Sequence, residues 1–251
     1  TGRVNQNTNT FASWNWKANG AGTTNTEGSQ DTTVSVNATA GFSICTFNNG
    51  SGSETFGHGL GVAPSMIIVR NIATCNWGVY HKSEGATKYL VFNDTAVTAT
   101  GNTFDDTAPT STVFSLNTAW FGAGLDGIAY CFAEKVGYSK FSSYIGNGND
   151  DGPFVYTGFK PAFIIMKNTQ QGGDDWILHN NKFPGYNVNN EYLYSNTTNA
   201  QIDASTLQLD MLSNGFKIRK STGAFNNNGE KMVYMAFASE PLVGDNPATA
   251  R

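Results

Sequence analysis

Charged side chains are scarce in this sequence. They make up 14% of its 251 residues, against about a quarter in an average soluble domain. Asparagine, threonine and glycine together supply about a third of the chain. These residues favour turns and strands and disfavour the interior of a helix. The composition therefore predicts an all-β protein with many polar loops.

Positive charge and long apolar runs are also lacking. Lysine and arginine number 15 against 19 aspartates and glutamates, and the formal net charge is −4. No basic stripe suited to phosphate binding is present. No apolar run reaches the length of about 18 residues that a membrane helix needs. We therefore expect no nucleic acid as a partner and no insertion into a membrane.

Cysteine is too rare to define a scaffold. Cys45, Cys75 and Cys131 are an odd number and lack metal-ligand spacing, so we expect reduced, structural thiols. The sequence also lacks a nucleophile elbow, a histidine pair at metal spacing and a phosphate-cradling glycine loop. We expect no cofactor, no metal and no catalytic residue.

The few titratable residues that could still carry chemistry lie in turns or at strand ends. His58 lies between two glycines, while His81 and His179 hold similar places in the two halves of the chain, so all three are interpreted as structural. Adjacent aspartates at 105–106, 150–151 and 174–175 could serve a glycosidase, but such pairs usually cap turns. The stretch NGNDDG at 147–152 is rich in possible calcium ligands yet lacks EF-hand spacing.

What the chain does contain is a long internal repeat. GHGLGVAPSMIIVRN at 57–71 returns as YTGFKPAFIIMKN at 156–168, with a constant offset of 97 for the glycine, proline and asparagine (158 − 61, 161 − 64, 168 − 71). The offset grows to 99 at Trp77 and Trp176 (176 − 77), both expected in the core, and to 105 at the closing strands (237 − 132). Loop insertions in two copies of a unit of about 100 residues would produce this drift.

Short apolar segments between turn residues predict the strands. At the end of the first copy, the bulky Ile128, Tyr130 and Phe132 alternate with small residues, as in a strand that packs onto a core. Strands are expected at 42–47, 65–71, 77–81, 89–92, 113–116 and 127–134, with counterparts at 141–145, 162–167, 175–179, 192–194, 215–219 and 231–238. The predicted fold is two tandem jelly-roll-like β-sandwich repeats. One larger, merged sandwich is the alternative.

The N-terminal segment repeats the pattern of a closing strand, because Ala12, Trp14 and Trp16 alternate with other residues after an asparagine-rich turn. We expect residues 1–20 to be the closing strand of a preceding repeat; a strand that joins the first sandwich is the alternative. The remaining divisions are a linker at 21–40, the repeats at 41–136 and 137–241, and a C-terminal tail at 242–251.

In this order, these segments resemble the tandem β-sandwich repeats of tail-fibre and other tail-associated proteins of bacteriophages, especially marine and cyanobacterial phages. The resemblance covers nearly the whole chain and is carried by segments such as SWNWKANG, TAGFSICTFNNGSG, NWGVYHKSEGATKYLVFNDTA, LSNGFKIR and YMAFASEP. It implies an extracellular structural protein of the virion tail with further repeats before residue 1. It also implies assembly with copies of itself, such as a trimer, or with other virion proteins.

The expected function is that of a structural and adhesive module, not an enzyme, which contacts a glycan on the host surface. The candidate ligand-binding residues lie in loops, where flat aromatic rings and amides can meet a sugar: Trp120, Phe121, Tyr186, Asn187 and Asn189. Aromatic residues in such loops also close the ends of a sandwich, so core roles stay open. The alternatives are a lectin-like carbohydrate-binding module of a bacterial surface protein and, less favoured, a polysaccharide-degrading enzyme.

Overall fold

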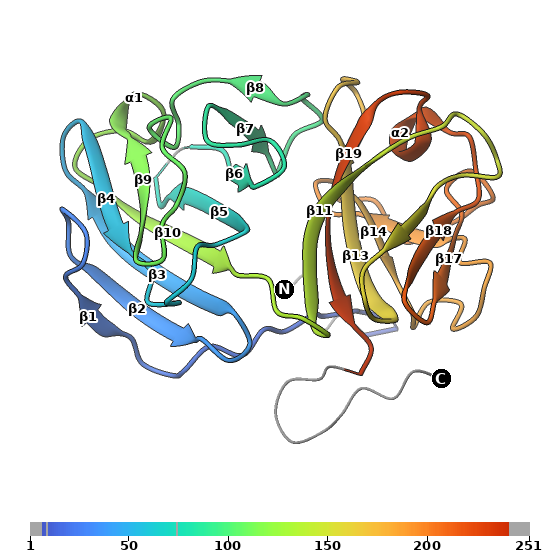
Figure 1. The fold of residues 1–251 in the computed structure, drawn as a ribbon, viewed down its shortest axis with the longest axis horizontal. Coiled ribbons are helices and arrows are strands. Elements are labelled where there is room, and N and C mark those ends of the chain that lie inside the picture. The colour runs from blue at the N-terminus through green and yellow to red at the C-terminus, as the bar shows by residue number, and fades with distance from the viewer. Residues whose placement is uncertain (1–6, 9, 74, 241–251) are drawn as a thin grey trace.

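A computed structural model describes residues 7–8, 10–73 and 75–240. It shows an all-β molecule in which antiparallel sheets form a β-sandwich-like fold (Figure 1). The elements of the first half are β1 (Thr23–Asn25), β2 (Thr32–Asn37), β3 (Phe42–Asn49), β4 (Ser53–Gly57), β5 (Met66–Asn71), β6 (Gly78–His81), β7 (Lys88–Val91), β8 (Ala99–Thr100), β9 (Val113–Asn117), α1 (Thr118–Phe121) and β10 (Leu125–Phe132). Those of the second half are β11 (Ser139–Ile145), β12 (Phe154–Tyr156), β13 (Pro161–Asn168), β14 (Ile177–Asn180), β15 (Glu191–Tyr194), β16 (Ile202–Asp203), β17 (Leu209–Leu212), β18 (Gly215–Ile218), α2 (Gly223–Asn226) and β19 (Lys231–Ala238).

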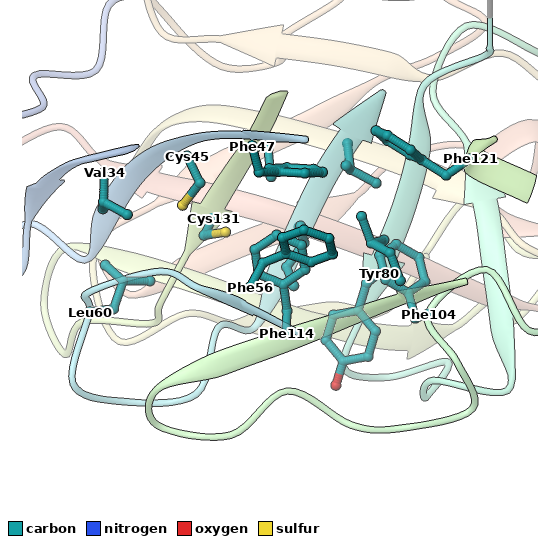
Figure 2. Packing of buried hydrophobic residues seen from close by; sticks show 14 of the residues in the cluster. Val34, Cys45, Phe47, Phe56, Leu60, Tyr80, Phe104, Phe114, Phe121 and Cys131 are labelled. Carbon is teal, nitrogen blue, oxygen red and sulfur yellow. The ribbon is translucent and has the colours of Figure 1, made fainter. Parts of the chain in front are cut away.

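The first half is built on an eight-stranded sheet with the order β1-β2-β3-β10-β5-β6-β7-β8. The two-stranded sheet β4-β9 covers one face of it. Between them lies the first outer core, in which Phe56 contacts Phe47 and Phe114 at centroid distances of 4.3 and 5.5 Å (Figure 2). Burial of each such ring stabilises the fold by about 2 kcal/mol. The thiols of Cys45 and Cys131 are buried in the same core (Figure 2).

The second half uses the same strand order. Its six-stranded sheet runs β11-β19-β13-β14-β15-β16, which matches β3-β10-β5-β6-β7-β8 strand for strand along the chain. The three-stranded sheet β12-β18-β17 covers one face. The second outer core lies between these two sheets and includes Ile164, Met166, Phe216 and Tyr234.

The two large sheets pack face to face through a third cluster, the middle core. Its buried residues come from both halves: Phe42, Met66, Val79, Leu90, Phe132, Phe141, Phe163, Ile165, Trp176, Leu178, Val233, Met235 and Phe237. On β19, residues of one parity face the second outer core and those of the other parity face the middle core. Because the central strands are covered on both faces, their sequences are nearly continuous runs of apolar residues. The result is four layers with three apolar cores between them.

Polar contacts at the edge of the middle core also join the halves. The indole Nε1 of Trp176 donates to the Val91 carbonyl at 2.9 Å, and the buried Lys167 ammonium donates to the Thr95 carbonyl at 3.2 Å. The backbone adds Thr98 N–H to Thr169 O at 3.0 Å. These bonds fix the register of one half on the other.

The all-β prediction is confirmed, and every strand expected between residues 42 and 238 overlaps an observed strand. Residues 21–40 are not a linker, however, because β1 and β2 extend the first sheet there. Polar threonine and asparagine hid these strands, although Val34 of β2 is buried in the first outer core. Part of the 137–241 division and the tail at 242–251 lie outside the described residues.

Residues 10–19 form no strand, so the alternative of an N-terminal strand that joins the first sandwich is wrong, whereas the closing strand of a preceding repeat stays a prediction. Trp14 and Trp16 instead lie against the middle core. Trp14 contacts Phe163 at 5.6 Å, and Trp16 contacts Phe132 of the first half and Phe237 of the second at 6.1 and 5.3 Å. The sequence pattern resembled a strand because every second residue is apolar, but both indoles point toward the seam between the two large sheets. Residues 1–6 and 9 lie outside the described part of the chain.

Candidate functional site

The helical turn α1 carries two of the predicted ligand-binding residues. Phe121 is completely buried in the first outer core, where Gly127 leaves room for its ring, so the prediction of ligand contact is wrong for Phe121. Trp120 is half-buried and packs on Gly78 and on the ring of Tyr89 at 5.9 Å. Both aromatic residues thus close the end of a sandwich layer.

Tyr186, Asn187 and Asn189 lie together at a small pocket that Lys160 and Lys182 also line. The Tyr186 ring is 73% exposed. The Asn187 amide bonds to the backbone of Met211, with Nδ2 to O at 3.0 Å and N–H to Oδ1 at 2.9 Å. Asn189 is buried, and its Nδ2 donates to the Asn180 carbonyl at 2.7 Å. Tyr186 and Asn187 are thus exposed, whereas Asn189 is buried; ligand binding by this trio stays a prediction.

A larger concave site, the inter-sheet groove, lies where the two large sheets separate. Its main cavity has a volume of about 630 Å³. The first sheet contributes Ile44, Ile68 and Tyr130, the second contributes Ile165, Leu178 and Leu193, Trp14 and Trp16 lie along its wall, and Ser195, Thr197 and Asn199 add polar groups. None of the described residues that line this cavity is charged.

The groove continues into a second cavity of about 440 Å³ that shares Ile68, Phe92, Tyr130, Ser195 and Thr197 with the first. This end adds Trp77 and the polar Asn93, Asn196 and Thr198.

Two rings form an aromatic surface at this end of the groove. The rings of Trp77 and Tyr130 are inclined by only 29°, with their centroids 6.1 Å apart. The Arg70 guanidinium lies over the Trp77 ring, 5.0 Å from its centroid, and this cation–π contact holds the indole. The half-exposed Trp77 corrects the expectation that both matched tryptophans are core residues, which holds for the fully buried Trp176.

The groove exists because equivalent rows of the two sheets are covered differently. Ile44, Tyr130 and Ile68 stand side by side across β3, β10 and β5 and are only half-buried. Tyr130 lies two residues before Phe132, and Met235 of the second sheet lies two residues before Phe237 in the same way. The row through Met235 is buried in the middle core, and it consists of Phe141, Met235 and Ile165. The first sheet therefore presents an apolar face that the second sheet leaves open.

One polar atom of the groove lacks a partner. The Ser195 hydroxyl is buried and makes no hydrogen bond within the described part of the chain, and Ser195 lines both cavities. The nearby side-chain amides already have partners, since Asn93 Oδ1 accepts the backbone N–H of Trp77 and Asn196 Oδ1 accepts the backbone N–H of Trp176, both at 2.9 Å. Sequence reasoning missed the groove because its residues come from both halves and meet only through the packing of the sheets.

The histidines serve the architecture. Leu60 N–H donates to Nδ1 of His58, as expected for a turn. His81 donates from Nε2 to the Tyr234 carbonyl of the other half at 3.2 Å, and burial lowers its pKa to about 4. Burial also lowers the pKa of His179 to about 4, and Nδ1 donates to Asn189. His81 and His179 are not equivalent. Ile67 and Ile164 are matched by the repeat offset of 97, but Ile67 pairs with Tyr80 whereas Ile164 pairs with His179. This one-residue shift points them to opposite faces.

The paired aspartates take part in turns and ion pairs. Asp105 and Asp106 adopt left-handed backbone angles, with φ of 53° and 48°, which aspartate tolerates in turns. A backbone hydrogen bond from Ser221 lowers the pKa of Asp150, and a hydrogen bond from Lys217 lowers that of Asp151. Desolvation raises the pKa of Asp174, although Lys167 lies nearby.

Within the described ranges, no cluster of three or more His, Cys, Asp or Glu side chains could hold a metal ion. In the stretch predicted as oxygen-rich, the side chains of Asn147 and Asn149 accept backbone N–H groups from Asn149 and Asp151. No helix in the described part of the chain is long and apolar enough to cross a membrane.

Comparison with protein families places the chain in one of them. It matches the family described as Domain of unknown function (DUF7483) over residues 1–241, and it therefore belongs to this family. Neither a curated protein nor a solved structure matches the chain.

Proposed function

We propose that the chain consists of two tandem jelly-roll-like β-sandwich repeats, with β1 and β2 added to the first. The shared strand order supports this. So do matched asparagines at the ends of β5 and β13. Asn71 donates from Nδ2 to the Phe121 carbonyl of α1 at 2.7 Å, and Asn168 donates likewise to the Gly223 carbonyl of α2 at 3.1 Å. Each side chain fastens the short helix of its own half.

A second matched pair performs another equivalent task. Asn93 Oδ1 accepts the N–H of Trp77, just before β6, and Asn196 Oδ1 accepts the N–H of Trp176, just before β14. The sequence offset of these pairs is 99 for the tryptophans (176 − 77) and 103 for the asparagines (196 − 93). Duplication of one unit explains why chemically identical bonds recur at matched places.

We further propose that these two repeats together form a structural and adhesive module of a phage tail fibre or tail appendage, and that this module contacts a glycan on the host surface. The observation that carries this is the inter-sheet groove, with its aromatic surface and its uncharged polar groups between two sheets that a buried core holds together. Sugar sites combine such surfaces with a few placed polar groups. Display in a homo-oligomer multiplies weak contacts into firm attachment.

The test measures retention on cells. The labelled chain, displayed in many copies on beads, is mixed with a panel of marine and cyanobacterial cells and with polysaccharide extracted from their surfaces. We expect beads to attach to at least one strain, to be displaced by its free polysaccharide, and to release no sugar. Attachment that the polysaccharide never displaces, or steady sugar release by the purified chain, would contradict the proposal.

The same groove would also suit a lectin-like module of a bacterial surface protein. The two functions differ in the assembly that they predict, because the tail-fibre function predicts a symmetric oligomer. Sedimentation of the chain distinguishes them: a defined oligomer favours the fibre, and a monomer with full glycan affinity favours the surface lectin.

A further inference from the structure

We propose that the inter-sheet groove binds a short stretch of a neutral hexose polymer, with sugar rings laid against Trp77 and Tyr130 and hydroxyl groups directed to Ser195. This inference rests on the proposed function and names the class of glycan and its site. It assigns binding to the seam between the two halves, away from the loops where the sequence placed the ligand residues.

The two walls of the groove match the two sides of a hexose ring. One wall consists of Tyr130, Ile68 and Trp77, which present apolar surface. The loop after β15 supplies hydroxyl groups from Ser195, Thr197 and Thr198 on the other side. A pyranose ring has an apolar C–H face and a hydroxyl rim, so it satisfies both walls at once. A purely apolar segment would leave the hydroxyl wall without partners.

The Ser195 hydroxyl is the second, independent observation. The hydroxyl oxygen is buried without a hydrogen-bond partner among the described residues, and the residue Ser195 lines both parts of the groove. A buried unsatisfied polar group costs about 1–3 kcal/mol, so native structures seldom keep one without a reason. Rotation of the Ser195 side chain toward the groove would let a ligand hydroxyl bond to it and would recover this cost on binding.

Charge selects against acidic and basic sugars. No described residue that lines either part of the groove is charged. Arg70, which lies over the Trp77 ring, is not among the residues that line either cavity, and its Nε donates to the Asn71 carbonyl at 2.9 Å. A carboxylate or ammonium on the sugar would lose hydration in the groove, and the described residues that line it offer no opposite charge. The two cavities, about 630 and 440 Å³, are of the size usual for small ligands.

The test titrates the intact chain with neutral and charged oligosaccharides of equal length. Cellohexaose, maltohexaose and β-1,4-galactohexaose are the neutral probes, and hexamers of galacturonate and of chitosan are the charged ones. Calorimetry and tryptophan fluorescence report binding. We expect at least one neutral hexamer to bind at least tenfold more tightly than both charged ones.

Variants locate the site. Trp77→Ala and Tyr130→Ala should each weaken binding about tenfold or more, as loss of a central aromatic contact does, and Trp77→Phe should restore most of it. Ser195→Ala should weaken binding several-fold. Tyr186→Ala, a change to an exposed ring in another pocket, should have no effect. Thermal unfolding of each variant is the folding control.

Three results would overturn the inference. The first is tighter binding of a charged hexamer, and the second is loss of binding in Tyr186→Ala but not in Trp77→Ala. The third is a Trp77→Ala variant that changes oligomeric state in sedimentation while glycan affinity stays unchanged, which would make the groove an interface between copies. Each of these leaves the proposed function intact if the chain still attaches to cells, whereas failure to attach to any cell or polysaccharide refutes that function itself.

Discussion

At the scale of single residues, His81 shows how burial turns an ordinary side chain into a pH-sensitive part of the fold. Its Nε2 donates to the Tyr234 carbonyl, and its Nδ1 accepts the Ser83 N–H at 3.2 Å. Both ring nitrogens are thus used by the neutral form. Burial lowers the pKa from 6.5 to about 4, so protonation competes with folding.

We predict that His81 makes the protein less stable in mild acid. The unfolded chain binds the proton on His81 more tightly than the folded chain does. The contribution of neutral His81 to the free energy of unfolding is therefore complete above about pH 6.5, and up to about 3 kcal/mol of it is lost as the pH falls toward 4. His81→Gln keeps a donor for Tyr234 and has no titratable ring. Urea unfolding at pH 7.5, 5.5 and 4.5 should show a smaller loss for this variant. An unchanged pH dependence would refute the assignment.

The histidines also show what the sequence could predict about a site. Their structural role was predicted from their positions in turns and at strand ends, but the prediction that His81 and His179 hold equivalent positions in the two halves was wrong. A shift of one residue in register exchanges the two faces of a strand, and nothing in the spacing from the preceding tryptophans reveals it. Phe121 was misassigned for a similar reason, because a loop aromatic looks the same whether it points inward or outward.

At the scale of elements, the N-terminal segment acts as a clamp across the two sheets. Trp16 contacts Phe132 from the first half and Phe163 and Phe237 from the second, at 5.3–6.1 Å. The Asn37 Nδ2 donates to the Lys17 carbonyl at 3.1 Å and ties the segment to β2.

We predict that Trp16→Ala lowers the free energy of unfolding by about 2 kcal/mol, less than the usual loss for a fully buried tryptophan because this ring is partly exposed. Chemical denaturation measures the change. Phe11→Ala, at a ring that is 53% exposed in the same segment, is the matched control and should change stability by less than about 0.5 kcal/mol. Equal effects of the two substitutions would mean that Trp16 does not clamp the sheets.

The strands show where sequence patterns succeed and where they stop. Segments with aliphatic and aromatic runs, such as β5, β13 and β19, were predicted because the central strands bury both faces. The strands β1 and β2 were missed, since threonine and asparagine cover their exposed faces and resemble a linker. The two tryptophans gave the opposite error: their alternation was real, but it reflected burial at a seam and not a ladder of hydrogen bonds.

At the scale of the whole molecule, the middle core holds the two walls of the inter-sheet groove together. It joins the two halves through apolar residues from both large sheets, and Trp176, Lys167 and His81 each donate a hydrogen bond from one half to the other. A groove between two loosely tethered domains would change shape with their motion. A groove between sheets that share a core keeps its walls at a fixed separation, which reduces the entropy lost on binding.

The most direct measurement of this central claim is differential scanning calorimetry of the intact chain at neutral pH. Because separation of the halves would expose the middle core, we predict one heat-absorption peak whose van't Hoff and calorimetric enthalpies agree, as for a single cooperative unit. Two resolved peaks, each with the enthalpy of about half the chain, would show that the halves unfold independently and would contradict the account.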